Sequence, residues 1–235
     1  QEIARYPLHT LAGIISFSYP GASPALMGAC AQRDISLAFC TPRGRFLARV
    51  TGASSGNVLL RRTQYRIADD PDPCCRIARS MIFGKIYNAR WSIERTRRDH
   101  GLRLDSGHLS SVSSQLKELL PQITEAFSLD ALRGLEGVGA TLYFSVFDQM
   151  LLGEKPFFQF SGRNRRPPQD PANALLSFAY SLLTHDCASA LESVGLDSYV
   201  GFLHRDRPGR TSLALDLIEE LRPCMADRFV LTLVN

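Results

Sequence analysis

Glu136 is a carboxylate within an otherwise apolar helical pattern. Its neighbours at helical spacing are apolar or small, among them Leu132, Gly139, Ala140 and Tyr143. Its side chain is therefore expected to project from an apolar stripe of a helix. Because a buried charge without a counter-charge is costly, this carboxylate needs a partner. An arginine and a metal ion are equally compatible with the local sequence.

A second group of chemically active residues occupies positions 201–220. His204 begins a loop that carries three arginines, Arg205, Arg207 and Arg210. Taken alone, His204 is most simply a loop residue with a hydrogen-bond partner. Guanidinium forks, however, match phosphate oxygens two at a time. The loop therefore also indicates a phosphate-binding region.

Carboxylates follow on the next predicted helix, which Ser212 can cap. Asp216, Glu219 and Glu220 are spaced so that they lie on one side of that helix. Acids in such a pattern are most simply an exposed helix face. In combination with His204 and the arginine loop, they offer a cation site next to phosphate-binding groups.

The basic residues are unevenly distributed and strongly biased toward arginine. Of the 27 basic residues, 24 are arginine and only Lys85, Lys117 and Lys155 are lysine. Residues 1–66 hold eight arginines against two acids, a net charge of +6, so the rest of this chain of net charge +4 carries −2. This distribution favours a nucleic-acid partner. A GC-rich coding sequence would enrich arginine as well and is the alternative.

Length and composition exclude several classes of protein. The 235 residues are 45% hydrophobic and 21% charged, which indicates a globular and not a disordered chain. No apolar run approaches the roughly 20 residues of a membrane helix, and we expect a cytoplasmic protein. The six cysteines form no C-x-x-C pair, which argues against a zinc finger. The chain opens at Gln1 without a signal sequence, and we expect a fragment of a longer protein.

The apolar pattern predicts an α+β fold with two parts. Strands are predicted at residues 11–17, 35–39 and 46–50, with a helix from Ser23-Pro24 to about residue 33. Beyond a turn-rich acidic break, Ile82, Ile86 and Ala89 mark one face of a long helix. Further helices are predicted at 111–127, 129–151, 171–194, 212–221 and 223–234. The predicted organisation is a small strand-rich domain at 1–68, a linker at 69–73 and a larger all-helical domain at 74–235.

Several segments of the chain resemble one known protein family, the CRISPR-associated integrases that insert new spacers. Its three motif blocks are similar to L-E-G-V-G-A-T-L-Y-F at 135–144, to R-N-R-R-P-P-Q-D-P-A-N-A-L-L-S-F-A-Y at 163–180 and to G-F-L-H-R-D-R-P-G-R-T-S-L-A-L-D-L-I-E-E-L-R-P at 201–223. Its strand domain is similar to P-L-H-T-L-A-G-I-I-S-F-S-Y-P-G-A-S-P-A-L-M at 7–27 and G-R-F-L-A-R-V at 44–50. The similarity covers nearly the whole chain and is closest to the type I-C branch. Relative to the family, the first strands and the last helices are missing.

The resemblance implies a metal-dependent DNA endonuclease and integrase whose helical domain is catalytic. The family's metal ligands correspond to Glu136, His204 and Glu219, which would hold Mn²⁺ or Mg²⁺. Asp216 would hydrogen-bond a ligand or serve as an alternate one. The implied partners are a second copy of the chain, the small second-numbered CRISPR-associated protein, a trimming nuclease, and double-stranded DNA as captured fragment and CRISPR repeat.

The implied reaction is a phosphodiester transesterification, in which a 3′-hydroxyl attacks a phosphate at the edge of the repeat. Asn173 is expected to orient a ligand or a phosphate. The arginines expected to hold DNA are Arg61, Arg62, Arg163, Arg165, Arg166, Arg205, Arg207 and Arg210. A non-catalytic DNA-binding scaffold, whose buried acids form only ion pairs, is the main alternative. A metallophosphohydrolase of small esters is a weaker one, because it leaves the arginine-rich first domain unexplained.

Overall fold

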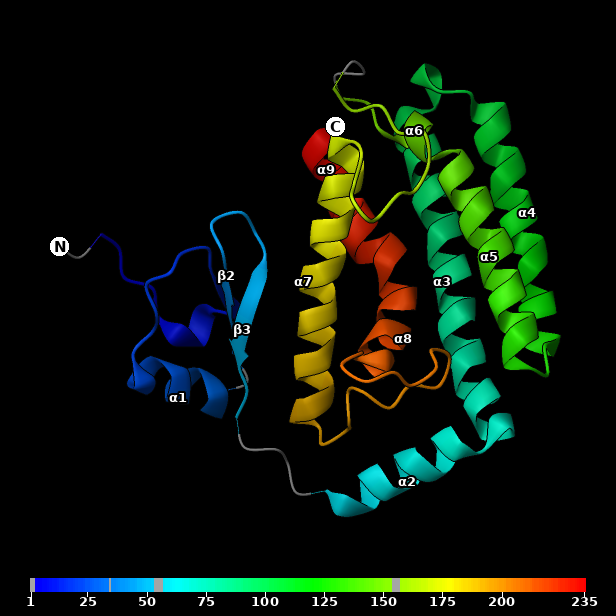
Figure 1. Ribbon diagram of the computed structural model, residues 1–235. Coiled ribbons are helices and arrows are strands. Elements are labelled where there is room, and N and C mark those ends of the chain that lie inside the picture. Colours follow the sequence, from blue (N-terminus) through cyan, green and yellow to red (C-terminus); the bar gives the residue numbers. More distant parts are fainter. Residues whose placement is uncertain (1–2, 34, 53–56, 154–156) are drawn as a thin grey trace.

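The computed structural model describes residues 3–33, 35–52, 57–153 and 157–235. It contains a small sheet near the N-terminus followed by a larger helical part (Figure 1), so the predicted α+β fold is confirmed. Within the described residues, none of the helices combines the length and the hydrophobicity needed to cross a membrane.

The sheet consists of three strands in the order in which they occur in the chain. These are β1 (Gly13–Ser16), β2 (Ser36–Cys40) and β3 (Phe46–Val50). The β1 and β2 strands are parallel, which requires a crossover, whereas β2 and β3 form an antiparallel hairpin. The three strands correspond to the three predicted runs.

The crossover between β1 and β2 is the helix α1 (Pro24–Gln32). Ser23 caps it, because its hydroxyl accepts a hydrogen bond from the Leu26 amide at 3.2 Å, and Pro24 occupies the first turn. Cys30 of α1 packs against Leu37 of β2 in a separate small core. A short 3-10 turn, Leu8–Thr10, precedes β1.

The helical part is organised around one long central helix. Its elements are α2 (Val58–Asp69), α3 (Pro71–His100), η2 (Gly101–Arg103), α4 (Ser106–Glu125), α5 (Leu129–Ser145), α6 (Phe147–Met150), α7 (Pro171–Ser193), α8 (Ser212–Leu221), the π-helical η3 (Arg222–Asp227) and α9 (Arg228–Val234). In Figure 1, α4 and α5 run beside α3 on one side, while α8 lies between α3 and α7 on the other. The main hydrophobic core lies between α3, α4 and α5, with Ile82, Ile86, Leu116 and Leu132 among its fully buried residues.

The predicted linker and the predicted helix at 223–234 can both be located in the structure. The predicted linker at 69–73 coincides with a bend between α2 and α3, where Asp70 is extended and caps α3 through the Asp72 amide. Helix α2 packs against α3, and the division into domains at 1–68 and 74–235 stays a prediction. The predicted helix at 223–234 begins as a π-helix, which the apolar period does not reveal.

Candidate active site

Helix α3 is closely approached by two other helices on either side of Lys85. A Cβ atom on Gly139 of α5 would meet the end of the Ile86 side chain, so α5 lies close against α3 at this glycine. A Cβ atom on Gly84 would lie 2.8 Å from Glu220 Oε2 of α8. Both approaches occur next to Lys85, and they bring α5 and α8 within reach of its side chain.

Lys85 joins two of the three predicted metal ligands. Its ammonium contacts Glu136 Oε1 of α5 and also lies 2.6 Å from Glu219 Oε2 of α8. The second oxygen of Glu219, Oε1, is 2.8 Å from Arg222 Nη1. The Glu219 side chain is only 5% exposed, whereas that of Glu136 is 29% exposed. The two carboxylates, 83 positions apart, therefore share one cationic group, the Lys85 ammonium.

The ion pairs control the charge of Glu219. Burial is the largest single influence on its pKa and would raise it, but Lys85 and Arg222 together hold the pKa below its ordinary value. The charge of His204 lowers the pKa slightly further. Glu219 is consequently ionised at neutral pH and is available as an anionic ligand.

Asp216 organises the loop that carries His204. Its carboxylate is fully buried and accepts hydrogen bonds from the amides of Phe202 at 2.6 Å, Leu203 at 2.9 Å and His204 at 2.9 Å. Its Oδ1 also lies 2.6 Å from His204 Nδ1. Since this bond occupies Nδ1, Nε2 is the ring nitrogen available to a ligand. Asp216 thus orients His204, the first of the two roles expected for it.

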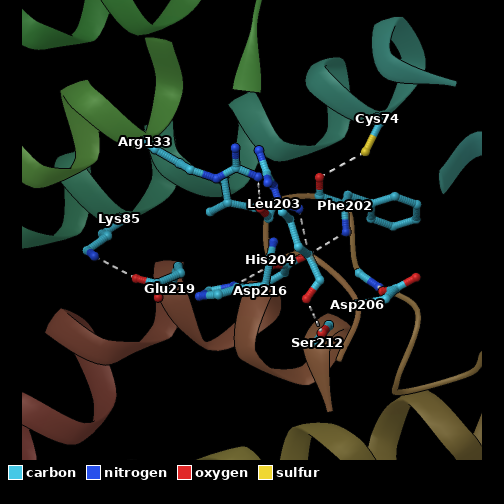
Figure 2. A network of polar contacts seen from close by, with 12 residues as sticks. Cys74, Lys85, Arg133, Phe202, Leu203, His204, Asp206, Ser212, Asp216 and Glu219 are labelled. Carbon is cyan, nitrogen blue, oxygen red and sulfur yellow. Dashed lines mark hydrogen bonds and ion pairs between the residues drawn. The ribbon is translucent and has the colours of Figure 1, made fainter. Parts of the chain in front are cut away.

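The loop at 201–204 is also held close to α8. A Cβ atom on Gly201 would lie 2.8 Å from Ser212 Cβ and 2.9 Å from Asp216 Oδ2, so only glycine fits there. Figure 2 shows His204 between Asp216 and Glu219, with Lys85 on the far side of Glu219. The imidazole therefore lies beside Glu219, and Glu219 is connected to Glu136 of α5 through Lys85.

The donor set suits a hard divalent cation, although the structure does not arrange it as a coordination shell. Among the residues that the structure describes, no three His, Cys, Asp or Glu side chains surround a common point closely enough to hold a metal. Glu136 and Glu219 nevertheless already face one positive charge, the Lys85 ammonium. Carboxylate oxygens with a single imidazole are ligands typical of Mg²⁺ and Mn²⁺. The residues therefore fit such an ion if it takes the place of the ammonium.

Arg163 is half-buried and bound to other side chains, whereas Arg165 and Arg166 are exposed. Its guanidinium donates to Asn173 Oδ1 at 2.7 Å and to Ser177 Oγ at 3.0 Å, and its Cζ is 5.2 Å from the centre of the Tyr180 ring. Asn173 is fully buried, and its Oδ1 also accepts the Asn164 amide at 3.1 Å. Asn173 therefore organises the arginine loop and does not face the carboxylates.

The remaining predicted DNA-binding arginines differ in exposure. Arg210 and Arg61 are half-buried, and Arg61 Nε donates to the Gly195 carbonyl at 3.0 Å. The exposed members of the set are Arg62, Arg165, Arg166, Arg205 and Arg207. These five are sterically able to contact a phosphate backbone.

Four functional neighbours were missed by sequence reasoning: Lys85, Arg222, Tyr180 and Asp227. Tyr180 donates to Asp227 Oδ1 at 2.5 Å, and the Arg222 guanidinium lies 5.0 Å from the centre of the Tyr180 ring. Burial raises the pKa of Asp227 to about 6. All four line a cavity of about 40 Å³ next to Glu136. For Lys85 a signal was present, because it is a rare lysine inside an apolar helical run.

Solved structures of integrating enzymes and related proteins share this fold. A casposase bound to its integration product has a TM-score of 0.77 and 26% identity, with 94% of this chain and 60% of that chain covered. A Cas1 protein from Thermotoga maritima has a TM-score of 0.76 and 25% identity, with 98% and 70% covered. A Cas6-RT-Cas1–Cas2 complex matches 97% of this chain and 24% of that chain, with a TM-score of 0.71 and 26% identity.

The sequence relatives define the family. Residues 1–235 match the family described as CRISPR associated protein Cas1, and the chain belongs to that family. It is 49% identical over 234 residues to a CRISPR-associated endonuclease Cas1 of Chlorobaculum tepidum and 50% identical over 235 residues to one of Rhodospirillum rubrum. It covers 68% and 67% of their lengths, and they cover 100% and 98% of this chain.

A fused relative extends the comparison. The chain is 38% identical over 239 residues to a Cas4 exonuclease/Cas1 endonuclease fusion of Geobacter sulfurreducens, which matches 100% of this chain and of which it covers 42%. The resemblance seen in the motif blocks is thus confirmed at the level of the family. The type I-C branch stays a prediction, because none of these names specifies a CRISPR subtype.

Proposed function

We propose that the protein is a metal-dependent DNA endonuclease and integrase that inserts captured DNA into a CRISPR array as new spacers. The observation that carries this proposal is the shared cation position between Glu136 and Glu219, with His204 beside it. In a Cas1 family chain, two carboxylates that share one cationic partner support this proposal, because a divalent ion could replace that partner. The casposase with a similar fold, bound to an integration product, supports strand transfer as the reaction.

Glu136, His204 and Glu219 would hold the metal, Mn²⁺ or Mg²⁺. When bound, the ion supplies Lewis-acid stabilisation of charge on the attacked phosphate and the leaving oxygen. Asp216 keeps His204 Nδ1 occupied and directs Nε2 toward the ligand position. Arg222 holds the other oxygen of Glu219, which restricts the rotation of that carboxylate.

The exposed arginines would hold the DNA. Arg205 follows His204 directly, Arg207 lies two positions further on, and Arg165 lines the cavity beside Glu136. A strand bound by these three residues would pass over the carboxylates. In the reaction, the 3′-hydroxyl of the captured strand loses its proton and its oxygen forms a bond to phosphorus. The phosphorus–oxygen bond of the repeat strand breaks, and the released oxygen takes up a proton, so that no proton is gained or lost overall.

The partners proposed are those expected from the sequence. The Cas6-RT-Cas1–Cas2 complex that shares the fold supports a complex with Cas2, and a homodimer is proposed from the family resemblance alone. A trimming nuclease fits the natural Cas4/Cas1 fusion. Because the chain spans only about two thirds of the curated Cas1 relatives, these partners are proposed for the whole protein.

One observation favours the alternative function, a DNA-binding scaffold. Lys85 and Arg222 already neutralise Glu136 and Glu219, so the acids could serve only as structural ion pairs. In that case DNA binding would be the whole activity, and it would not need a metal.

Chelation separates the two functions. The full-length protein with its Cas2 partner is mixed with labelled repeat DNA and a donor fragment, in Mn²⁺ or in EDTA, and both DNA binding and strand transfer are measured. We expect binding to survive chelation and strand transfer to require Mn²⁺. Glu219→Gln should abolish transfer, whereas Glu125→Gln, on the exposed side of α4, should not. Transfer in EDTA, or full transfer by Glu219→Gln, would leave the scaffold as the better account.

A further inference from the structure

Helix α2 contacts the segment that leads into the His204 loop, and a single buried side chain makes most of that contact. We infer that Gln64 is a positioning residue for His204, because it fixes residues 197–200 immediately before the loop that Asp216 holds. The inference rests on the proposed function of His204 as a ligand. Gln64 touches neither the carboxylates nor His204 and would act only through the backbone.

Gln64 uses its whole amide on this segment. Its Nε2 donates to the carbonyl of Asp197 at 2.8 Å and to that of Val200 at 3.0 Å, and its Oε1 accepts from the Asp197 amide at 2.9 Å. The residue is only 3% exposed, although it lies on a helix that is mostly exposed to solvent. A buried amide with three backbone partners fixes both ends of a four-residue segment.

The same segment is tied to the helix that carries the acids. The Ser198 carbonyl accepts from the Leu213 amide at 3.0 Å and lies 3.4 Å from the Ala214 amide, in the first turn of α8. Val200 is followed directly by Gly201, a position where only a glycine fits against Ser212 and Asp216. The segment that Gln64 binds is therefore bound to α8 as well. A displacement of this segment would move the backbone amides of the following loop relative to the Asp216 carboxylate that accepts their hydrogen bonds.

Two further side chains of α2 contact the segment more weakly. The Tyr65 hydroxyl donates to Asp197 Oδ2 at 2.9 Å, and Arg61 Nε donates to the Gly195 carbonyl at 3.0 Å. Tyr65 is exposed and Arg61 is half-buried, so solvent can replace part of either bond. Gln64 is the most buried of the three side chains, and its loss would remove three hydrogen bonds from backbone groups of the segment.

Mn²⁺ binding to the full-length protein provides the first test. We compare wild type, Gln64→Met, His204→Ala, the double variant and the control Gln115→Met, an exposed glutamine on α4. Gln64→Met should weaken Mn²⁺ binding about 10-fold, which is the low end for changes that reorient a ligand. The control should leave binding within about 2-fold of wild type.

The double variant distinguishes positioning from general stabilisation. If Gln64 acts through His204, adding Gln64→Met to His204→Ala should cause no further loss of Mn²⁺ affinity, because the position of an absent imidazole no longer matters. A loss that simply adds to that of His204→Ala would overturn the inference, as would unchanged Mn²⁺ affinity in folded Gln64→Met.

A second measurement needs no metal and separates failure of the inference from failure of the proposed function. The ¹⁵N spectrum of the imidazoles at one fixed pH reports which nitrogen of His204 carries the proton. Gln64→Met should mix or shift the His204 signal, and Gln115→Met should not. If wild type binds no Mn²⁺ through His204, the proposed function fails, and this spectrum alone decides the role of Gln64. Should Gln64→Met not fold, Tyr65→Phe should shift the same signal less, and an unchanged signal there would contradict the inference.

Discussion

Lys85 Nζ lies 2.6 Å from Glu219 Oε2, so a lysine of α3 is paired with an acid 134 positions later in α8. The same ammonium contacts Glu136 of α5. Three helices thus meet at one positive charge, where the Cas1 family resemblance implies a divalent ion. A lysine and a metal ion cannot both occupy the point between the two carboxylates, and several predictions depend on this competition.

Replacing Lys85 with Met should destabilise the metal-free protein. Glu219 would keep Arg222 but lose its second partner, and breaking a buried ion pair costs on the order of 3 kcal/mol. Mn²⁺ should restore part of the lost stability and should bind more tightly than to wild type, because no ammonium competes. Thermal unfolding with and without Mn²⁺ measures both effects. Lys117→Met, at an exposed position on α4, is the control; a Lys85→Met protein that Mn²⁺ does not stabilise would contradict the proposed metal site.

Asp227→Asn should change how stability depends on pH. Burial raises the pKa of Asp227 from 3.8 to about 6 in the folded protein, so folding favours the protonated carboxyl. The stability that this protonation contributes is complete below the unfolded pKa and is lost as the pH rises through about 6. The asparagine keeps an acceptor for Tyr180 but does not titrate.

The measurement is the melting temperature of both proteins between pH 4 and pH 7.5. As the pH rises, the stability of Asp227→Asn should increase relative to that of wild type. The difference in the free energy of unfolding should change by on the order of 3 kcal/mol across the range. A constant difference between the two curves would show that Asp227 does not titrate in this range.

Asp216→Asn should reduce Mn²⁺ affinity and strand transfer together. The carboxylate accepts from three amides and from His204, and an asparagine cannot accept all four of these hydrogen bonds. Mutation of a residue that orients a metal ligand in this way typically lowers metal affinity by about 10-fold to 100-fold. For Asp216→Asn we expect a loss at about the upper end of this range. Asp130→Asn, whose side chain is 83% exposed, is the matched control. If folded Asp216→Asn bound Mn²⁺ with the full wild-type affinity, Asp216 would not be needed to orient His204.

Arg207 and Arg163 should behave differently although both belong to predicted DNA-binding loops. Arg207 is exposed, so Arg207→Gln should lower the salt dependence of DNA binding by about 0.9 in the slope of log affinity against log salt. Arg163 donates to Asn173 and Ser177, so Arg163→Gln should lower the melting temperature and leave that slope unchanged. DNA-binding titrations at several salt concentrations measure these slopes. Equal slopes for wild type and Arg207→Gln would count against a contact between Arg207 and a phosphate.

Much of the fold follows from local pattern. The gaps between Ile82, Ile86 and Ala89 predicted α3, and Ser23 with Pro24 predicted the start of α1, because periodicity and capping are local properties of the chain. The π-helix at Arg222–Asp227 was not predicted, since its hydrogen-bond register depends on packing and not on apolar spacing.

The candidate site was predicted in part. The family motifs indicated Glu136, His204 and Glu219, and the apolar surroundings of Glu136 indicated that it needs a partner. They did not identify that partner as Lys85, because the contact depends on close helix approaches at Gly84 and Gly139. Nothing in the spacing of α2 separates Gln64 from its exposed neighbours, because its partners are backbone groups more than 130 positions away.

The most direct test of the proposed metal site is an anomalous difference map from crystals of the full-length protein grown with Mn²⁺. We predict one strong peak about 2.0 to 2.6 Å from carboxylate oxygens of Glu136 and Glu219 and from His204 Nε2, with the Lys85 ammonium withdrawn from between the acids. The crystals should be grown at a Mn²⁺ concentration that supports strand transfer. If they show no peak at this position and Lys85 still bridges the two glutamates, these residues form a structural ion pair and not the metal site of an integrase.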